Sequence, residues 1–228
     1  MSKTTIPTGG ITADAINGTL IADDAINSEH YTDGSIDTAH IGDNQVTAAK
    51  ATGVGGLSLV TSFTPSSEGS TIVVDNCFTS TYDRYVVYCE RLRNGNDAAR
   101  LEVYLRTGGS SGSDSGNLGG AYLGYRYNNQ SISGSYSNSS NAIIAHNIKN
   151  DYYYNLMMDF IQPYDSAFAT SILGQSVYRE GSNNVYGFLN FGYQPDNTVS
   201  HTGFAITLSA GNFNQTNSTI KVYGITDS

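Results

Sequence analysis

The chain has 228 residues, with 20 acidic side chains against 11 basic ones and a formal net charge of -9. This balance argues against a protein that binds nucleic acid through a basic face. Charged residues make up 14% of the sequence, well below the roughly 25% of an average globular domain. Since the chain is instead rich in glycine and tyrosine, with 25 and 17 residues, we expect a polar surface that carries few charges.

The sequence contains no candidate for a membrane-spanning helix, which needs a run of about 18 apolar residues. Its first residues lack the charged and then apolar plan of a signal peptide, so we expect no membrane insertion and no export by the ordinary route. The two cysteines, Cys77 and Cys89, are too few for a disulfide framework. Because both lie in strand-like runs, we predict two reduced and buried thiols.

From residue 6 to residue 46, a large side chain recurs at every fifth position. We call this set the pentad ladder; it consists of Ile6, Ile11, Ile16, Ile21, Ile26, Tyr31, Ile36, Ile41 and Val46. Five residues advance an α-helix by about 500°, so the ladder would form no apolar stripe on a helix. In a strand the odd period changes face each time, so either a turn interrupts each repeat or both faces are covered. Glycine, asparagine and aspartate residues recur at intervals that favour turns.

One large side chain per five residues cannot close a hydrophobic core within a single chain. We therefore expect three chains to wind around a common axis, so that residues 11–56 form a homotrimeric shaft with the ladder residues as its trimerisation contacts. Two alternatives stay open. The segment is acidic and poor in apolar residues, as in a disordered low-complexity arm, and it could also form a monomeric solenoid of about two coils, which is fewer than stable stacking needs.

His30 and His40 stand directly before ladder positions, in the same phase of the repeat. In a trimer each would form a ring of three imidazoles that could hold a metal ion on the axis. No close His-x-His pair accompanies them. We therefore predict solvated or hydrogen-bonded histidines, with no metal and no cofactor.

Beyond residue 56, short runs of β-branched and aromatic residues alternate with clusters of Gly, Ser, Asn and Asp. These runs predict eleven strands, at residues 57–63, 71–78, 84–92, 100–107, 121–127, 142–148, 153–162, 168–178, 185–193, 204–209 and 219–225. No stretch of comparable length has helical periodicity. The sequence therefore predicts an all-β protein in which an extended repeat shaft precedes an antiparallel β-sandwich of the jelly-roll type, at residues 57–228.

Two segments rich in Gly, Ser and Asn, residues 108–120 and 128–141, are predicted to be long loops. Tyrosines flank them, and a tyrosine offers a flat face for a sugar ring and a hydroxyl that stays hydrated. The candidate receptor-binding residues are Tyr122, Tyr125, Tyr127, Asn128, Asn129 and Tyr136, with the run from Tyr152 to Tyr154 as a second candidate. Packing or contact between subunits is the competing explanation for each tyrosine.

Two parts of the sequence resemble bacteriophage fibre proteins. The phrase Ser80-Thr81-Tyr82-Asp83-Arg84-Tyr85-Val86-Val87, the run from Leu101 to Gly109 and the closing strand from Ser218 to Ile225 resemble the carboxy-terminal domain of many phage fibre and appendage proteins. The ladder, with phrases such as Asp24-Ala25-Ile26-Asn27-Ser28-Glu29-His30, looks like the amino-terminal shaft repeats of phage tail fibres. Together the resemblances cover most of the chain.

The resemblance implies a homotrimeric virion fibre that is assembled in the host cytoplasm. Residues 1–10 would anchor it to other virion proteins, residues 11–56 would form the shaft, and residues 57–228 would form the tip. The expected function is attachment of a tail fibre to a host cell-surface polysaccharide or an outer-membrane receptor. A fibre that decorates the capsid or connects parts of the neck, without binding a receptor, is the alternative.

A polysaccharide-degrading appendage enzyme is a further alternative, because glycoside hydrolysis needs two carboxylates about 5 to 9.5 Å apart. Carboxylates are available at Asp159, Asp165, Glu180 and Asp196, but none belongs to a recognisable motif. Glu180 and its neighbour Arg179 are predicted to be a surface pair at the end of a strand. We therefore expect no enzymatic activity and no catalytic residues.

Overall fold

The computed structural model describes residues 6–7, 9–12, 15–16, 19–22, 25–37, 39–42, 45–46, 56–65, 69–96, 99–108, 118–126, 131–150, 152–181, 186–214 and 217–225. Of residues 28, 126, 131–133 and 136–138 it describes the backbone alone. The chain divides into two compact units, Met1–Thr52 and Gly53–Ser228. The described part of the first unit contains a short 3-10 helix, η1 (Ser28–His30), and a series of turns.

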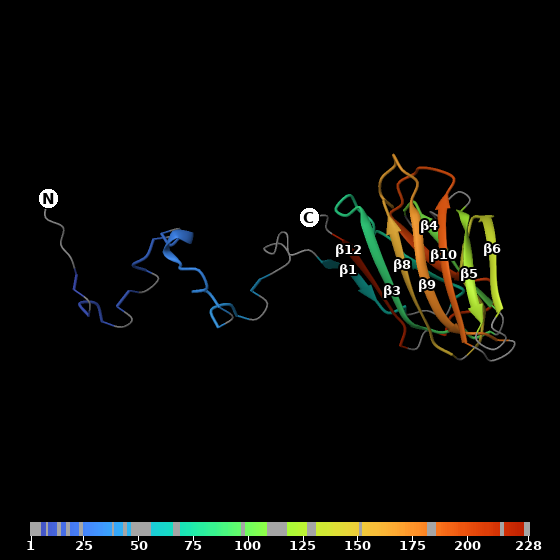
Figure 1. Ribbon diagram of the computed structural model, residues 1–228, viewed down its shortest axis with the longest axis horizontal. Helices are drawn as coiled ribbons and strands as arrows, with labels where there is room; N and C mark the ends of the chain where they lie inside the picture. Colours follow the sequence, from blue (N-terminus) through green and yellow to red (C-terminus); the bar gives the residue numbers. More distant parts are fainter. Residues whose placement is uncertain are drawn as a thin grey trace. The chain divides into compact units, whose positions relative to one another are not determined.

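The described strands form two antiparallel sheets in the second unit (Figure 1). The larger sheet has eight strands, in the order β1 (Leu57–Phe63), β12 (Thr219–Ile225), β3 (Arg84–Leu92), β8 (Tyr154–Ile161), β9 (Ser171–Arg179), β10 (Tyr186–Pro195), β5 (Leu118–Arg126) and β6 (Ser131–Ser139). The smaller sheet has four, in the order β2 (Thr71–Val74), β11 (Gly203–Leu208), β4 (Ala99–Arg106) and β7 (Ala142–Ile148). The prediction of an all-β chain is confirmed.

All eleven predicted strands are present, with ends that lie within four residues of the predicted ones. The prediction of a loop over residues 128–141 was wrong for β6, and the predicted loop over residues 108–120 ends earlier because β5 begins at Leu118. The sequence of β6, Ser-Ile-Ser-Gly-Ser-Tyr-Ser-Asn-Ser, offers little hydrophobic alternation. β6 is an edge strand that pairs with β5 along its whole length. Backbone hydrogen bonds to β5 therefore keep it in the sheet, although its sequence lacks a regular apolar face.

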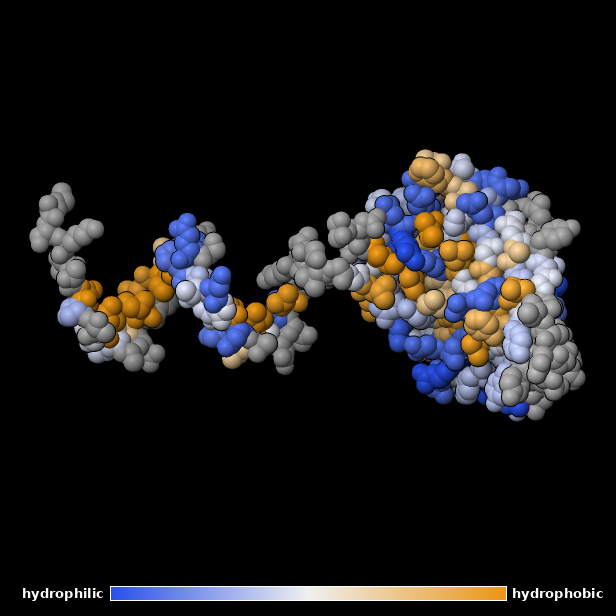
Figure 2. Space-filling view, viewed as in Figure 1, coloured by the Kyte–Doolittle hydropathy of each residue, from blue (hydrophilic) through white to orange (hydrophobic). Residues whose placement is uncertain are grey.

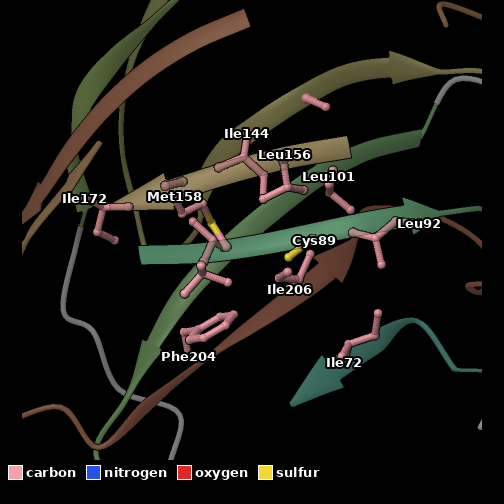
Figure 3. Packing of buried hydrophobic residues seen from close by; sticks show 14 of the residues in the cluster. Ile72, Cys89, Leu92, Leu101, Ile144, Leu156, Met158, Ile172, Phe204 and Ile206 are labelled. Atoms are coloured by element: carbon pink, nitrogen blue, oxygen red, sulfur yellow. The ribbon is translucent and has the colours of Figure 1, made fainter. Parts of the chain in front are cut away.

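One hydrophobic core fills the space between the two sheets (Figure 3). Leu101 of β4 and Ile206 of β11 come from the smaller sheet, and Cys89 of β3 and Met158 of β8 come from the larger sheet. Each of these side chains is at most 1% exposed. Because inward residues alternate with outward ones along the strands, the two sheets bury their apolar faces against each other as a β-sandwich.

Both cysteines are free and buried in this core, as predicted. Burial raises the pKa of the Cys77 thiol from its ordinary value to about 12. Burial likewise raises the pKa of the Cys89 thiol above its ordinary range. Because the thiolate is the nucleophile, both side chains behave as small apolar groups at neutral pH.

A charged pair joins the ends of β4 and β2 at one end of the smaller sheet. The Nε–H of Arg106 donates a hydrogen bond to Oδ1 of Asp75 at 2.6 Å, and its Nη2–H donates to Oδ2 at 3.1 Å. The Arg106 side chain is only 4% exposed and that of Asp75 is 22% exposed. The hydrogen bond to Asp75 raises the pKa of Arg106 above its ordinary value. The Asp75 carboxylate therefore compensates the cost of burying the positive charge of Arg106.

We predict that Asp75→Ala lowers the free energy of unfolding by about 3 to 5 kcal/mol, because it leaves the guanidinium buried without its carboxylate. Urea denaturation followed by tyrosine fluorescence measures the loss. Lys221→Ala is the matched control, since Lys221 pairs with Glu90 at 3.3 Å where both side chains are about one third or more exposed. Such a pair contributes less than about 1 kcal/mol, and equal losses in the two variants would contradict the role given to Asp75.

We predict that neither thiol reacts with a disulfide reagent in the folded protein at pH 8. The raised pKa values keep both thiols protonated, and burial denies access to the reagent. Absorbance of the released thiolate measures the reaction, with the chain unfolded in urea as the control that gives two equivalents. Fast reaction of one thiol before unfolding would show that its side chain is accessible.

Candidate functional site

Turns lie between successive residues of the pentad ladder in seven intervals that the structure describes. In each of these turns, the carbonyl of the residue after one ladder position accepts a hydrogen bond from the N–H of the residue before the next. Seven such turns are described. Their hydrogen bonds run from the N–H of the first residue to the carbonyl of the second in the pairs Gly10–Pro7, Ala15–Thr12, Ala25–Ala22, His30–Asn27, Ser35–Thr32, His40–Asp37 and Gln45–Gly42. Their N···O distances are 2.8 to 3.2 Å. Of the two alternatives that the odd period left open, a turn in each repeat is the one present at these positions.

The turns leave every ladder side chain exposed. The exposed fraction ranges from 37% at Ile21 to 64% at Ile6. Figure 2 shows hydrophobic side chains, in orange, at the surface along the first unit. Full burial of an isoleucine is worth about 1.5 to 3 kcal/mol, and the described residues of one chain supply no cover for this ladder. The turn hydrogen bond itself pairs one N–H with one C=O of each described repeat. In the two histidine repeats, the side chains of Asn27, His30, Asp37 and His40 accept further backbone N–H groups.

His30 and His40 close equivalent turns that lie ten residues apart. Nδ1 of His30 is 2.8 Å from Oδ1 of Asn27, and Nδ1 of His40 is 2.8 Å from Oδ1 of Asp37. Both rings are therefore hydrogen-bonded within their own repeat, as predicted. Over the part of the chain that the structure describes, no group of three or more His, Cys, Asp or Glu side chains is arranged to hold a metal ion.

The predicted receptor-binding residues do not form one described cluster. Tyr122 points inward from β5, where it packs against the core and stacks on His146 at 6.4 Å between ring centroids. Tyr125 lies on the opposite face of the same strand and is 42% exposed. The period of two along a strand separates these two side chains. Tyr127, Asn128 and Asn129 lie outside the described residues, and only the backbone of Tyr136 is described.

Exposed aromatic side chains gather instead at the end of the larger sheet where β9 ends and β10 begins. Arg179, the last residue of β9, pairs with Tyr186, the first residue of β10. The guanidinium carbon of Arg179 lies 4.9 Å from the ring centroid of Tyr186 and 4.7 Å from that of Tyr152. Tyr186 is 61% exposed and Tyr152 is 38% exposed. We call Tyr152, Arg179 and Tyr186 the tyrosine–arginine platform.

The platform was only partly visible in the sequence, since Tyr152 belongs to the second predicted candidate but Arg179 and Tyr186 were missed as binding residues. A signal for them existed. The two predicted strands that flank them are neighbours in the chain, and an antiparallel hairpin would place residue 179 opposite residue 186. Tyr125 lies close in register, because it pairs with Phe188 on the same outer face of the sheet.

The outer face of the larger sheet carries further exposed apolar side chains, and some of them reach the surface in Figure 2. Those that are about half exposed include Leu59, Leu123, Leu173 and Val177. A hollow of about 260 Å³ on this face is lined by residues that include Tyr88, Met157, Val177 and Phe188. Isolated exposed apolar residues are common, but several on neighbouring strands of one sheet indicate a surface suited to contact with another protein.

The carboxylates considered for catalysis have structural partners. Asp159 accepts from Nε of Arg84 at 2.9 and 3.0 Å, and Oδ1 of Asp165 accepts from the N–H of Ala167 at 2.7 Å. Glu180 was predicted on the surface, and this was wrong, because it is 2% exposed and accepts a hydrogen bond from Asn147 at 2.9 Å. Asp196 lies at the exposed end of β10.

Comparisons with protein-family models, curated proteins and solved structures find no match for this chain. The residues that the structure describes include no helix that is long and apolar enough to cross a membrane.

Proposed function

We propose that the chain is a homotrimeric fibre protein of a bacteriophage virion, with a shaft at residues 11–56 and a tip at residues 57–228 that attaches to the host surface. The observation that carries this proposal is the exposed pentad ladder, with a turn between its members. Three chains that place one ladder residue each at every level form a continuous apolar column, flanked by the polar turns. The backbone groups that the turns leave open then find partners in neighbouring chains or in water.

The tip supports the same assembly. The outer face of its larger sheet exposes apolar side chains on β1, the strand at which the tip begins, and on β5 and β9. Contact between copies through this face would bury these side chains. The nearby charges Arg84 and Asp159, and Lys221 and Glu90, are paired within one chain, so they add little repulsion between copies.

The strand order supports a jelly-roll tip. The smaller sheet has the order β2-β11-β4-β7, and the larger sheet has β3 beside β8 and β5 beside β6. If the hairpin β9–β10 is an insertion and β1 and β12 are additions at the edge, the remaining strands form the two four-stranded sheets of a jelly roll. Jelly rolls occur in viral capsid and lectin domains, which fits a virion protein with a binding tip.

Host attachment is supported by the tyrosine–arginine platform, which we propose as the contact with a surface polysaccharide or an outer-membrane receptor. Tyrosine rings offer flat apolar faces to sugar rings while their hydroxyls remain available for hydrogen bonds. Arg179 holds both rings and limits their freedom before binding. Residues 1–10 would join the fibre to other virion proteins.

The trimer is tested by sedimentation of the purified chain, which is expected at three times the 24.3 kDa of one copy. The double variant Ile16→Asp and Ile26→Asp is expected to separate the chains or to open the shaft, because it places charges in the apolar column, while the far-ultraviolet spectrum of the sandwich stays unchanged. Thr12→Asp with Ala22→Asp is the matched control at turn positions. A stable monomer, or a trimer that survives the ladder variant unchanged, would remove the basis of the proposal.

Host attachment is tested with the labelled full-length protein and cells of the bacterium that the phage infects. We predict that Tyr152→Ser with Tyr186→Ser lowers cell binding by about tenfold, the scale expected when two aromatic contacts are lost, and that the wild-type protein competes with phage adsorption. Phe168→Ser, at an aromatic position that is 53% exposed in another loop, is the control. Failure of the wild-type protein to bind cells would favour a decorating or connecting fibre, and release of reducing sugar from host polysaccharide would favour an enzyme.

A further inference from the structure

Loops from three parts of the sandwich form a polar pocket of about 380 Å³ at one end of the larger sheet. Asp83 directly precedes β3 and Gln162 directly follows β8, and these strand ends are paired through Arg84 and Ile161. Ser200, between β10 and β11, comes from the third loop. The tyrosine–arginine platform lies at the opposite end of the sheet, where β9 ends. The pocket is therefore separate from the proposed attachment site.

Backbone hydrogen bonds tie the three loops to one another. The N–H of Gln162 donates to the carbonyl of Asp83 at 2.6 Å, and the N–H of His201 donates to the carbonyl of Pro163 at 2.7 Å. Gln162 has a φ of 53°, in the left-handed region that non-glycine residues adopt infrequently and that often accompanies functional sites. These bonds fix the wall of the pocket in the free protein, which reduces the entropy that a ligand must remove on binding.

Two tyrosines supply the aromatic part of the wall. The ring of Tyr82 packs edge-on against Tyr85, with centroids 5.7 Å apart. It also lies against Gly224 of β12, where an added Cβ would collide with the ring. Tyr164 is 39% exposed. The pocket thus has one ring fixed by packing and a second ring open to solvent, a combination that suits stacking on a small ring-shaped ligand.

The charge of the pocket is negative. Asp83 and Asp165 line it, and none of its described lining residues is basic. Arg84, the cation next to Asp83 in the chain, donates to Asp159 on the outer face of the sheet. Asp165 uses Oδ1 to accept the N–H of Ala167, which orients the carboxylate while Oδ2 has no partner among the described residues. Carboxylates in such a site attract a cation and disfavour an anion.

From this geometry we propose that the pocket binds a single sugar residue that carries a free ammonium group, an amino sugar. The tyrosine faces would stack on the sugar ring, and the side chains of Ser166, Ser200 and Gln162 would exchange hydrogen bonds with its hydroxyls. Asp83 and Asp165 would accept charge-assisted hydrogen bonds from the ammonium group. The same charges exclude sugars that carry a carboxylate, such as uronic acids. A volume of about 380 Å³ falls in the ordinary range for small-ligand sites.

The proposal is tested on the full-length protein by nuclear magnetic resonance titration with glucosamine, glucose, glucuronate and methylammonium. The titration is made at pH 6, where the primary amine of the probe is protonated. Glucosamine is expected to bind more tightly than glucose, and glucuronate is expected not to bind. Methylammonium is expected to bind more weakly than glucosamine, because it lacks the ring that the tyrosines contact.

Asp165→Asn is expected to weaken glucosamine binding about tenfold while leaving glucose binding nearly unchanged, because it removes the charge and keeps an acceptor for the N–H of Ala167. Glu90→Gln, which removes one charge outside the pocket, is the matched control and should change neither affinity. Tyr164→Ala should weaken both sugars together. Absence of binding by every probe, equal affinity for glucosamine and glucose, or loss of binding in Glu90→Gln as large as in Asp165→Asn would overturn the proposal. None of these outcomes depends on trimer formation or on host attachment.

Discussion

A repeat with one large side chain and one turn in every five residues cannot bury that side chain on its own, and this constraint governs the first unit. The turn hydrogen bonds, such as the one from Gly10 to Pro7, close each repeat locally. They bring no second apolar layer over Ile16 or Ile26, which remain about half exposed. The proposed trimer follows from this shortage of apolar surface. The second unit meets the same need within one chain, because its two sheets cover each other.

The antiparallel arrangement of the strands also determines where binding sites can form. Successive strands run in opposite directions, so loops collect at two ends of the larger sheet. One end joins the residues before β3 to those after β8 and holds the acidic pocket with Tyr82 and Tyr164. The other end joins β9 to β10 and holds the platform around Arg179. In the proposed function, the platform would contact the host surface at one end of the sheet, and the pocket would bind a single sugar residue at the other.

The fold was largely predictable, and the sites were less so. Strands such as β4 and β12 follow from alternation of apolar and polar residues, which a single sequence displays directly. β6 was missed because pairing with its neighbour, and not an apolar face, holds it in place. Tyr122 and Tyr125 are close in sequence but lie on opposite faces, whereas Tyr152 and Arg179 are distant in sequence and in contact. Only the order and register of strands brings such residues together.

The sequence by itself determined the spacing of the pentad ladder, the recurrence of turn-forming residues between its members, the burial of Cys77 and Cys89 and the all-β character of the second unit. These properties depend on residues that are close along the chain or on the period of one element. The tertiary structure decided which tyrosines share a surface, that Glu180 is buried, and that Asp83 and Asp165 line one pocket. These contacts join residues that are far apart in the sequence. A local sequence pattern does not indicate which strands become neighbours in the sheets.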